Sequence, residues 1–131
     1  MPTPAITTLR TTIATALTDN SKWQTFAFPP ATVLPNSVIV GWDSPMLEMQ
    51  NNQYNAISPM ANFRILMTVP MLDNQGNLAG LEEIITGVFN ALAASSLNVA
   101  VNEVSEPSVM ELASGDLLSA EMSISILTSW S

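Results

Sequence analysis

The stretch ANFRILMTVPMLDNQGNLAGLEEIITGVFNALAA, residues 61–94, decides the fold. Within residues 61–69 every odd position is apolar and every even position except Leu66 is polar. This period of two predicts a strand with one face against a core. Pro70 has no N–H to donate and therefore ends the strand, and residues 73–76 have the composition of a turn.

After this turn the apolar residues recur at helical spacing, which predicts an amphipathic helix over residues 77–94. A second helix is predicted over residues 3–17, because Thr3 is a suitable N-cap and Pro4 suits the first helical position. The later helix is expected to bury one stripe, made of Leu78, Leu81, Ile85, Val88, Phe89 and Leu92.

Shorter segments are apolar or alternate in the manner of strands. Residues 37–42 are almost wholly apolar and rich in β-branched side chains, which predicts a strand buried on both faces. Strands are also predicted over residues 23–28, 97–102 and 118–126. Residues 109–112 are a candidate continuation of the strand over 97–102, beyond a break.

These elements predict one α+β domain over residues 1–131, in the order α-β-β-β-α-β-β. The sheet is expected to be mostly antiparallel, with both helices packed on one of its faces. The predicted core includes Ile13, Phe63, Ile65, Ile85, Phe89 and Ile124.

Residues 43–58 have no clear period and predict a long loop, with apolar side chains among Asn and Gln. A structureless segment of this length in a small domain is usually functional or disordered. Met and aromatic side chains suit an adaptable contact surface. We therefore predict that this loop contacts a neighbouring subunit or tube; the alternative is a hairpin extension that covers its own sheet. The candidate interface residues are Met46, Leu47, Met49 and Tyr54.

The chain has eleven acidic and three basic residues, Arg10, Lys22 and Arg64, and its net charge is −8. Binding to phosphates needs clustered Lys and Arg, so this composition argues against nucleic-acid binding and against attraction to an anionic membrane. Only 11% of the residues are charged while 47% are hydrophobic. Such a surface favours self-association; the alternative is an uncharged polar surface that is solvated without a partner.

The chain lacks the residue types of most catalytic sites. It has no His and no Cys, which excludes nucleophile–imidazole pairs, thiolate chemistry and imidazole metal sites. It also has no glycine-rich phosphate-binding motif, and Arg64 is expected to form an ion pair. We expect no enzymatic activity, no cofactor, no metal, no secretory signal and no membrane span.

The order of elements and the composition resemble the tail-terminator, or tail-completion, proteins of long-tailed bacteriophages. The resemblance runs through most of the chain. It includes the apolar strand at residues 38–42, the long loop that follows, the strand that ends at Val69 and Pro70, the helix after residues 73–76 and the alternating final strand.

The resemblance implies a structural virion protein, made in the host cytoplasm and located at the head-proximal end of the tail. It implies a homohexameric ring that caps the tail tube and contacts the tube protein and the neck or head-completion protein. Six globules roughly 30 Å across leave a hole on the order of 27 Å, wide enough for duplex DNA to pass. We expect DNA to pass through this lumen without specific binding.

Two alternatives remain open from the sequence. The first is another neck protein or a tail-tube subunit, of which the latter would polymerise without limit. The second is a small non-viral cytosolic binding domain, monomeric or dimeric, with a ligand pocket.

Overall fold

The computed structural model describes most of the chain, namely residues 6–18, 22–27, 35–48, 60–70, 74–95, 97, 99–112 and 115–128. The described residues form two helices and a six-stranded mixed sheet. In chain order the elements are α1 (Ile6–Leu17), β1 (Gln24–Phe26), β2 (Ser37–Glu48), β3 (Met60–Pro70), α2 (Asn74–Ala94), β4 (Val99–Val104), β5 (Ser108–Met110) and β6 (Leu117–Leu127).

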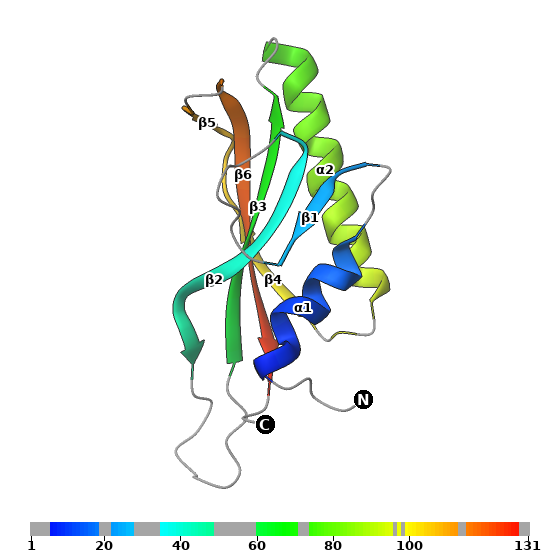
Figure 1. The fold of residues 1–131 in the computed structure, drawn as a ribbon, viewed down its shortest axis with the longest axis vertical. Coiled ribbons are helices and arrows are strands. Elements are labelled where there is room, and N and C mark those ends of the chain that lie inside the picture. Colours follow the sequence, from blue (N-terminus) through cyan, green and yellow to red (C-terminus); the bar gives the residue numbers. More distant parts are fainter. Residues whose placement is uncertain are drawn as a thin grey trace, which may run out of the picture.

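The strands lie in the order β1-β2-β3-β6-β4, and β5 pairs with the first residues of β6. The β1–β2 pair is parallel and the other pairs are antiparallel. Both helices lie on the same side of the twisted sheet (Figure 1). The predicted α+β fold is therefore confirmed, with β5 as a separate short strand.

The core lies between the helices and one face of the sheet. In β3 the odd residues 61–69 are at most 3% exposed, as the alternation predicted. Phe63 stacks on Trp42 of the neighbouring strand, with ring centroids 4.3 Å apart. Ile13, Phe63, Ile65 and Ile124 are all in the core, so four of the six predicted core residues are confirmed.

The predicted stripe of α2 was wrong at Leu78 and Phe89, which are 39% and 49% exposed, and Ile85 is only partly buried. The helix instead buries Leu81, Ile84, Val88 and Leu92. Each residue advances about 100° around a helix, so Phe89 lies about 100° from Val88, on the flank of the helix and outside the buried stripe.

Two predicted boundaries were also wrong. The helix α2 begins at Asn74, so residues 74–76 form its first turn instead of a separate turn. The strand β2 continues to Glu48, so residues 43–48 belong to a strand and not to a loop. The register between β2 and β3 shifts between Trp42 and Leu47, which hides the strand period in the sequence.

The helix layer is fixed at its centre by Trp23, which is 4% exposed. Its indole Nε1 donates a hydrogen bond of 2.8 Å to the Leu17 carbonyl at the end of α1. Its ring lies against Gly87 of α2, where an added Cβ would be 2.9 Å from the ring. Trp23 therefore connects α1 to the middle of α2.

Candidate assembly surfaces

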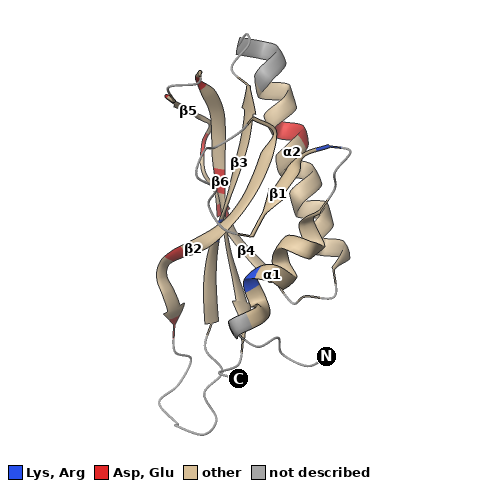
Figure 2. Cartoon of the chain, viewed as in Figure 1, with Lys and Arg blue, Asp and Glu red and all other residues tan. Residues whose placement is uncertain are grey.

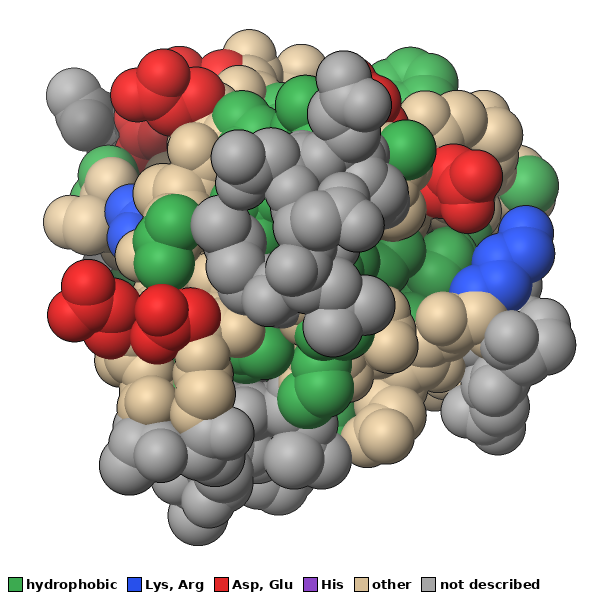
Figure 3. Space-filling model, turned by 90° about the horizontal axis from the view of Figure 1, so that it is seen from above, with side chains coloured by type: hydrophobic (Ala, Val, Ile, Leu, Met, Phe, Trp, Pro, Cys, Tyr) green, Lys and Arg blue, Asp and Glu red, His purple; other side chains and the backbone are tan. Residues whose placement is uncertain are grey.

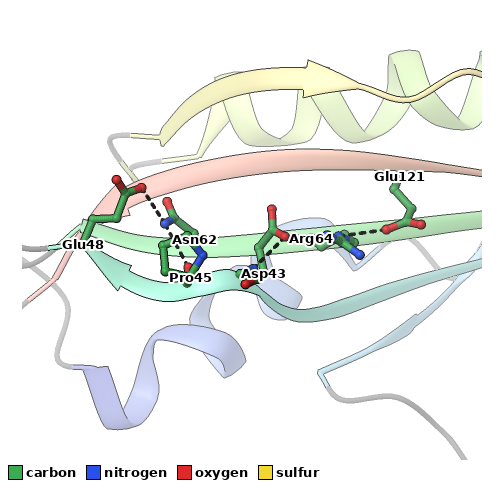
Figure 4. A network of polar contacts seen from close by, with 7 residues as sticks. Asp43, Pro45, Glu48, Asn62, Arg64 and Glu121 are labelled. Atoms are coloured by element: carbon green, nitrogen blue, oxygen red, sulfur yellow. Dashed lines mark hydrogen bonds and ion pairs between the residues drawn. The ribbon is translucent and has the colours of Figure 1, made fainter.

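The face of the sheet opposite the helices carries Arg64 between two carboxylates (Figure 4). Its guanidinium lies 2.7 Å from Asp43 Oδ1 on β2 and 2.9 Å from Glu121 Oε2 on β6. Register explains this arrangement, because Gly41 and Ser123 are the direct partners of Arg64 on the two neighbouring strands. The predicted ion pair of Arg64 is confirmed.

The charges of this triad are stabilised by one another. Partial desolvation opposes ionisation of Asp43, but the Ser44 N–H, the Arg64 guanidinium and Ser123 together hold the pKa of Asp43 below its ordinary value. Hydrogen bonding to Asp43 and the charge of Glu121 raise the pKa of Arg64. The only basic residue of the sheet is thus occupied by acidic neighbours.

A second polar network lies on the same face, towards the end of β2 (Figure 4). Asn62 Nδ2 donates to the Pro45 carbonyl at 3.0 Å and to Glu48 Oε1 at 2.8 Å. Asn62 Oδ1 accepts a 2.7 Å bond from the Ser125 hydroxyl. Asn62 is only 6% exposed, so these bonds hold the irregular end of β2 against β3 and β6.

The predicted interface at residues 43–58 is only partly described. Met46 is 45% exposed and is available for contact, whereas Leu47 is partly buried against the core. Met49 and Tyr54 lie outside the described residues. The structure therefore places one of the four candidates at an open surface, on β2.

A second exposed apolar surface lies on the helix side of the sheet, where the sequence analysis had not predicted one. We call it the α2–β5 strip and define it as Leu78, Ile85, Phe89, Val104 and Val109. Four of its five members are 39% to 49% exposed. Seen from above, hydrophobic side chains reach the surface between separate acidic groups (Figure 3).

The strands place their two members of the strip on the helix side. Val104 is the register partner of Met122, and Val109 is the partner of Leu118. Both partners belong to or pack against the core beneath the helices. The two valines therefore form the outer edge of the helix-covered face.

The helix places its three members of the strip on the flank that faces away from Trp23. Gly87 contacts the Trp23 ring, and Ala91 and Ala94 line a groove shared with α1. Leu78, Ile85 and Phe89 lie on the other side of the buried stripe, since residues 87 and 85 are about 160° apart around the helix. Their spacing of seven and four was the available sequence signal, but it was assigned to the core.

A groove with a volume of about 700 Å³ lies between α1 and α2. It is lined by hydroxyl and aliphatic groups, with no charged residue among those described. The lining residues include Thr8, Thr12, Thr15, Ala91 and Leu97. The groove therefore lacks charged groups to orient a polar ligand.

No cluster of three potential metal ligands occurs among the residues that the structure describes. Within the same residues, neither helix has the length and apolar character needed to span a membrane. Comparison with models of protein families found no match. Comparison with curated proteins also found no match.

Proposed function

We propose that the protein is a structural virion subunit of the tail-terminator kind. Six copies form a ring that caps the tail tube, joins it to the neck of the head and lets DNA pass through its lumen. Its partners are other copies of itself, the tube protein and a neck protein, and it performs no catalysis.

The observation that carries this proposal is the α2–β5 strip in a chain with few charges. A monomeric soluble domain usually covers its surface with charged side chains, which make up about a quarter of average proteins but only 11% here. Phe89 on α2 and Val109 on the helix side of the sheet are each 49% exposed. Apolar groups gathered in this way favour burial against another protein.

The Arg64 triad supports the part of the proposal that concerns DNA. A duplex in transit must not be held by its phosphates, and phosphate binding depends on accessible Lys and Arg. Arg64 is bonded to Asp43 and Glu121, so phosphates would have to displace two carboxylates from it. The open face of the sheet therefore offers DNA no unpaired cation among its described residues.

The mass of the purified protein in solution tests the ring directly. Six copies of the 14.0 kDa chain give a particle of about 84 kDa in light scattering and native mass spectrometry. Negative-stain images should show closed rings with a central hole. A particle that stays a monomer at all concentrations would contradict the proposal.

The same measurement separates the alternatives. A tube subunit would form filaments whose length grows with concentration, because its contacts do not close. A small binding domain would remain a monomer or dimer, and the groove between α1 and α2 would then be its candidate pocket. Salt-sensitive retention of DNA by a ring would leave the ring intact but contradict its role as a passive conduit.

A further inference from the structure

The charges of the chain are divided unequally between its two halves. Residues 1–72 contain three acidic and three basic residues, so this half is formally neutral. Residues 73–131 contain eight acidic residues and no basic one, so the whole net charge of −8 belongs to this half. The division is a property of the sequence and does not depend on any side-chain placement.

The fold places the strands of the two halves side by side, and the halves meet where β3 pairs with β6. The sheet order β1-β2-β3-β6-β4 puts all strands of the neutral half on one side and all strands of the acidic half on the other. The helix α1 packs mainly on β2, and α2 packs mainly on β3 and β6. In Figure 2 the acidic residues of the second half lie around β5, on β6 and on α2, while α1 carries a basic residue.

The α2–β5 strip lies wholly in the acidic half. Glu82 lies beside it on α2, four residues after Leu78, and Glu106 and Glu111 lie near its β5 end; all three are exposed. Pairing of this strip with the same strip of a second copy would bring these carboxylates together without a cation to separate them. Like charges in close contact are unfavourable, so symmetric pairing is disfavoured.

The neutral half offers the complementary surface. Arg10 on α1 is exposed, does not line the groove with α2 and forms no ion pair with any residue that the structure describes. Met46 on β2 supplies an exposed apolar side chain in the same half. Glu48 on β2 is also exposed, and its Oε1 accepts a hydrogen bond from Asn62. With the exposed Arg10 present, this side brings fewer uncompensated like charges to an acidic, apolar strip than a second copy of the strip would.

We propose that the α2–β5 strip of one copy docks against the α1–β2 side of the next copy, which carries Arg10 and Met46. This contact joins two different surfaces, so it propagates from copy to copy and closes when the rotation permits. This proposal rests on the proposed ring and adds which two surfaces form each subunit interface. The charge division fixes the direction in which the subunits follow one another.

Mixing two blocked variants tests this contact. Phe89→Asp puts a charge into the strip and should raise the dissociation constant of assembly at least tenfold. Arg10→Glu reverses the charge of the receiving side and should also raise this dissociation constant. Each variant keeps one surface intact, so an equimolar mixture should form one-to-one dimers that neither variant forms alone. Sedimentation velocity measures all three samples.

The remaining outcomes decide the proposal. If Arg10→Glu alone assembles like the unaltered protein and Phe89→Asp does not, the strip pairs with itself and the directed contact is overturned. If Phe89→Asp still forms complete rings, the strip is not the joint, although the ring survives. If the unaltered protein is monomeric, the ring itself fails, which distinguishes failure of the function from failure of the contact.

Two controls guard these results. Leu78→Gln should weaken assembly, whereas Leu127→Gln should not, although both leucines are 39% exposed. Asn90→Asp also adds negative charge to α2, but on the flank away from the strip, and should leave assembly nearly unchanged. Circular dichroism melts show whether each variant is folded. If Phe89→Asp is unfolded, the assembly of Leu78→Gln tests whether the strip is part of the contact.

Discussion

The two faces of β3 are buried by different means. On the helix side Phe63 and Ile65 are completely buried among apolar neighbours. On the opposite side Asn62 is nearly as buried, yet its side chain forms three hydrogen bonds with groups on β2 and β6. Alternate residues of β3 therefore stabilise the fold in two ways, by apolar burial on one face and by hydrogen bonds between buried polar groups on the other.

This difference determines how each face responds to mutation. Truncation on the helix side removes apolar contacts and leaves a cavity, whose cost grows with its size. Change on the open side costs most when a buried partner loses its only hydrogen bond. A substitution can therefore be severe on either face, but for separate physical reasons.

The largest expected effect is that of Phe63→Ala on the helix side. It removes a buried ring that stacks on Trp42 and should lower the free energy of unfolding by about 3–5 kcal/mol in urea titration. Leu66→Ala is the matched control, because it truncates a half-buried side chain on the other face of the same strand. Equal losses at both positions would remove the distinction between the faces.

The next effect is that of Asn62→Leu, which keeps the volume but removes all three polar contacts of the side chain. It should cost about 2–3 kcal/mol, since Pro45 O and the Ser125 hydroxyl lose a buried partner. Amide hydrogen exchange at the end of β2 should also become faster.

Asn102→Ala provides the comparison for this network. Asn102 donates to Ser125 from the exposed side, so its loss can be compensated by water and should cost under about 1 kcal/mol. A cost for Asn62→Leu as small as that of Asn102→Ala would mean that the buried network does not hold β2.

A smaller effect is expected at two glycines of α2. Alanine favours a helix by up to about 1 kcal/mol over glycine, so Gly80→Ala, which meets no atom within 4 Å, should raise the melting temperature. Gly87→Ala places its Cβ against the Trp23 ring, which is fixed by its bond to Leu17, and should cost about 1–2 kcal/mol. If both substitutions raise the stability, the Trp23 ring must shift at little cost to accommodate the added Cβ at residue 87.

The sequence predicted β3 and β6 well because alternation in a strand maps directly onto the two faces of a sheet. It predicted α2 less well, since this helix carries apolar residues over more of its circumference than the core covers. Which part of a wide apolar arc faces the sheet depends on what packs beside it, here Trp23 against Gly87. Phe89 was consequently assigned to the core instead of the surface.

The types of interaction at the candidate surfaces could be predicted from the sequence, but the residues that take part in them could not. Three basic residues among eleven acidic ones made an ion pair for Arg64 the expected outcome. Its partners could not be chosen, because Asp43 and Glu121 reach it only through the register of β2 and β6. The end of β2 was missed because its attachment to β3 depends on hydrogen bonds from Asn62, which is distant in the sequence, and not on a local pattern.

The smallest effect concerns the ion pair of Asp43 with Arg64 on the open face. Folding lowers the pKa of Asp43, so its ionised form stabilises the folded state at a pH above the unfolded value of 3.8. This contribution is lost as the pH falls below about 4 and through the lower pKa of the folded state. Asp43→Asn should therefore reduce stability at neutral pH but differ less from the unaltered protein in acid.

The size of this effect follows from exposure. The Arg64 side chain is 50% exposed, so solvent screens the pair and the loss at pH 7 should be at most about 1 kcal/mol. Chemical denaturation from pH 2.5 to 7 measures the difference between Asp43→Asn and the unaltered protein, with Asp116→Asn as a control that removes an exposed carboxylate away from Arg64. A difference that is constant across this range would mean that Asp43 stabilises the open face by packing and not by its charge.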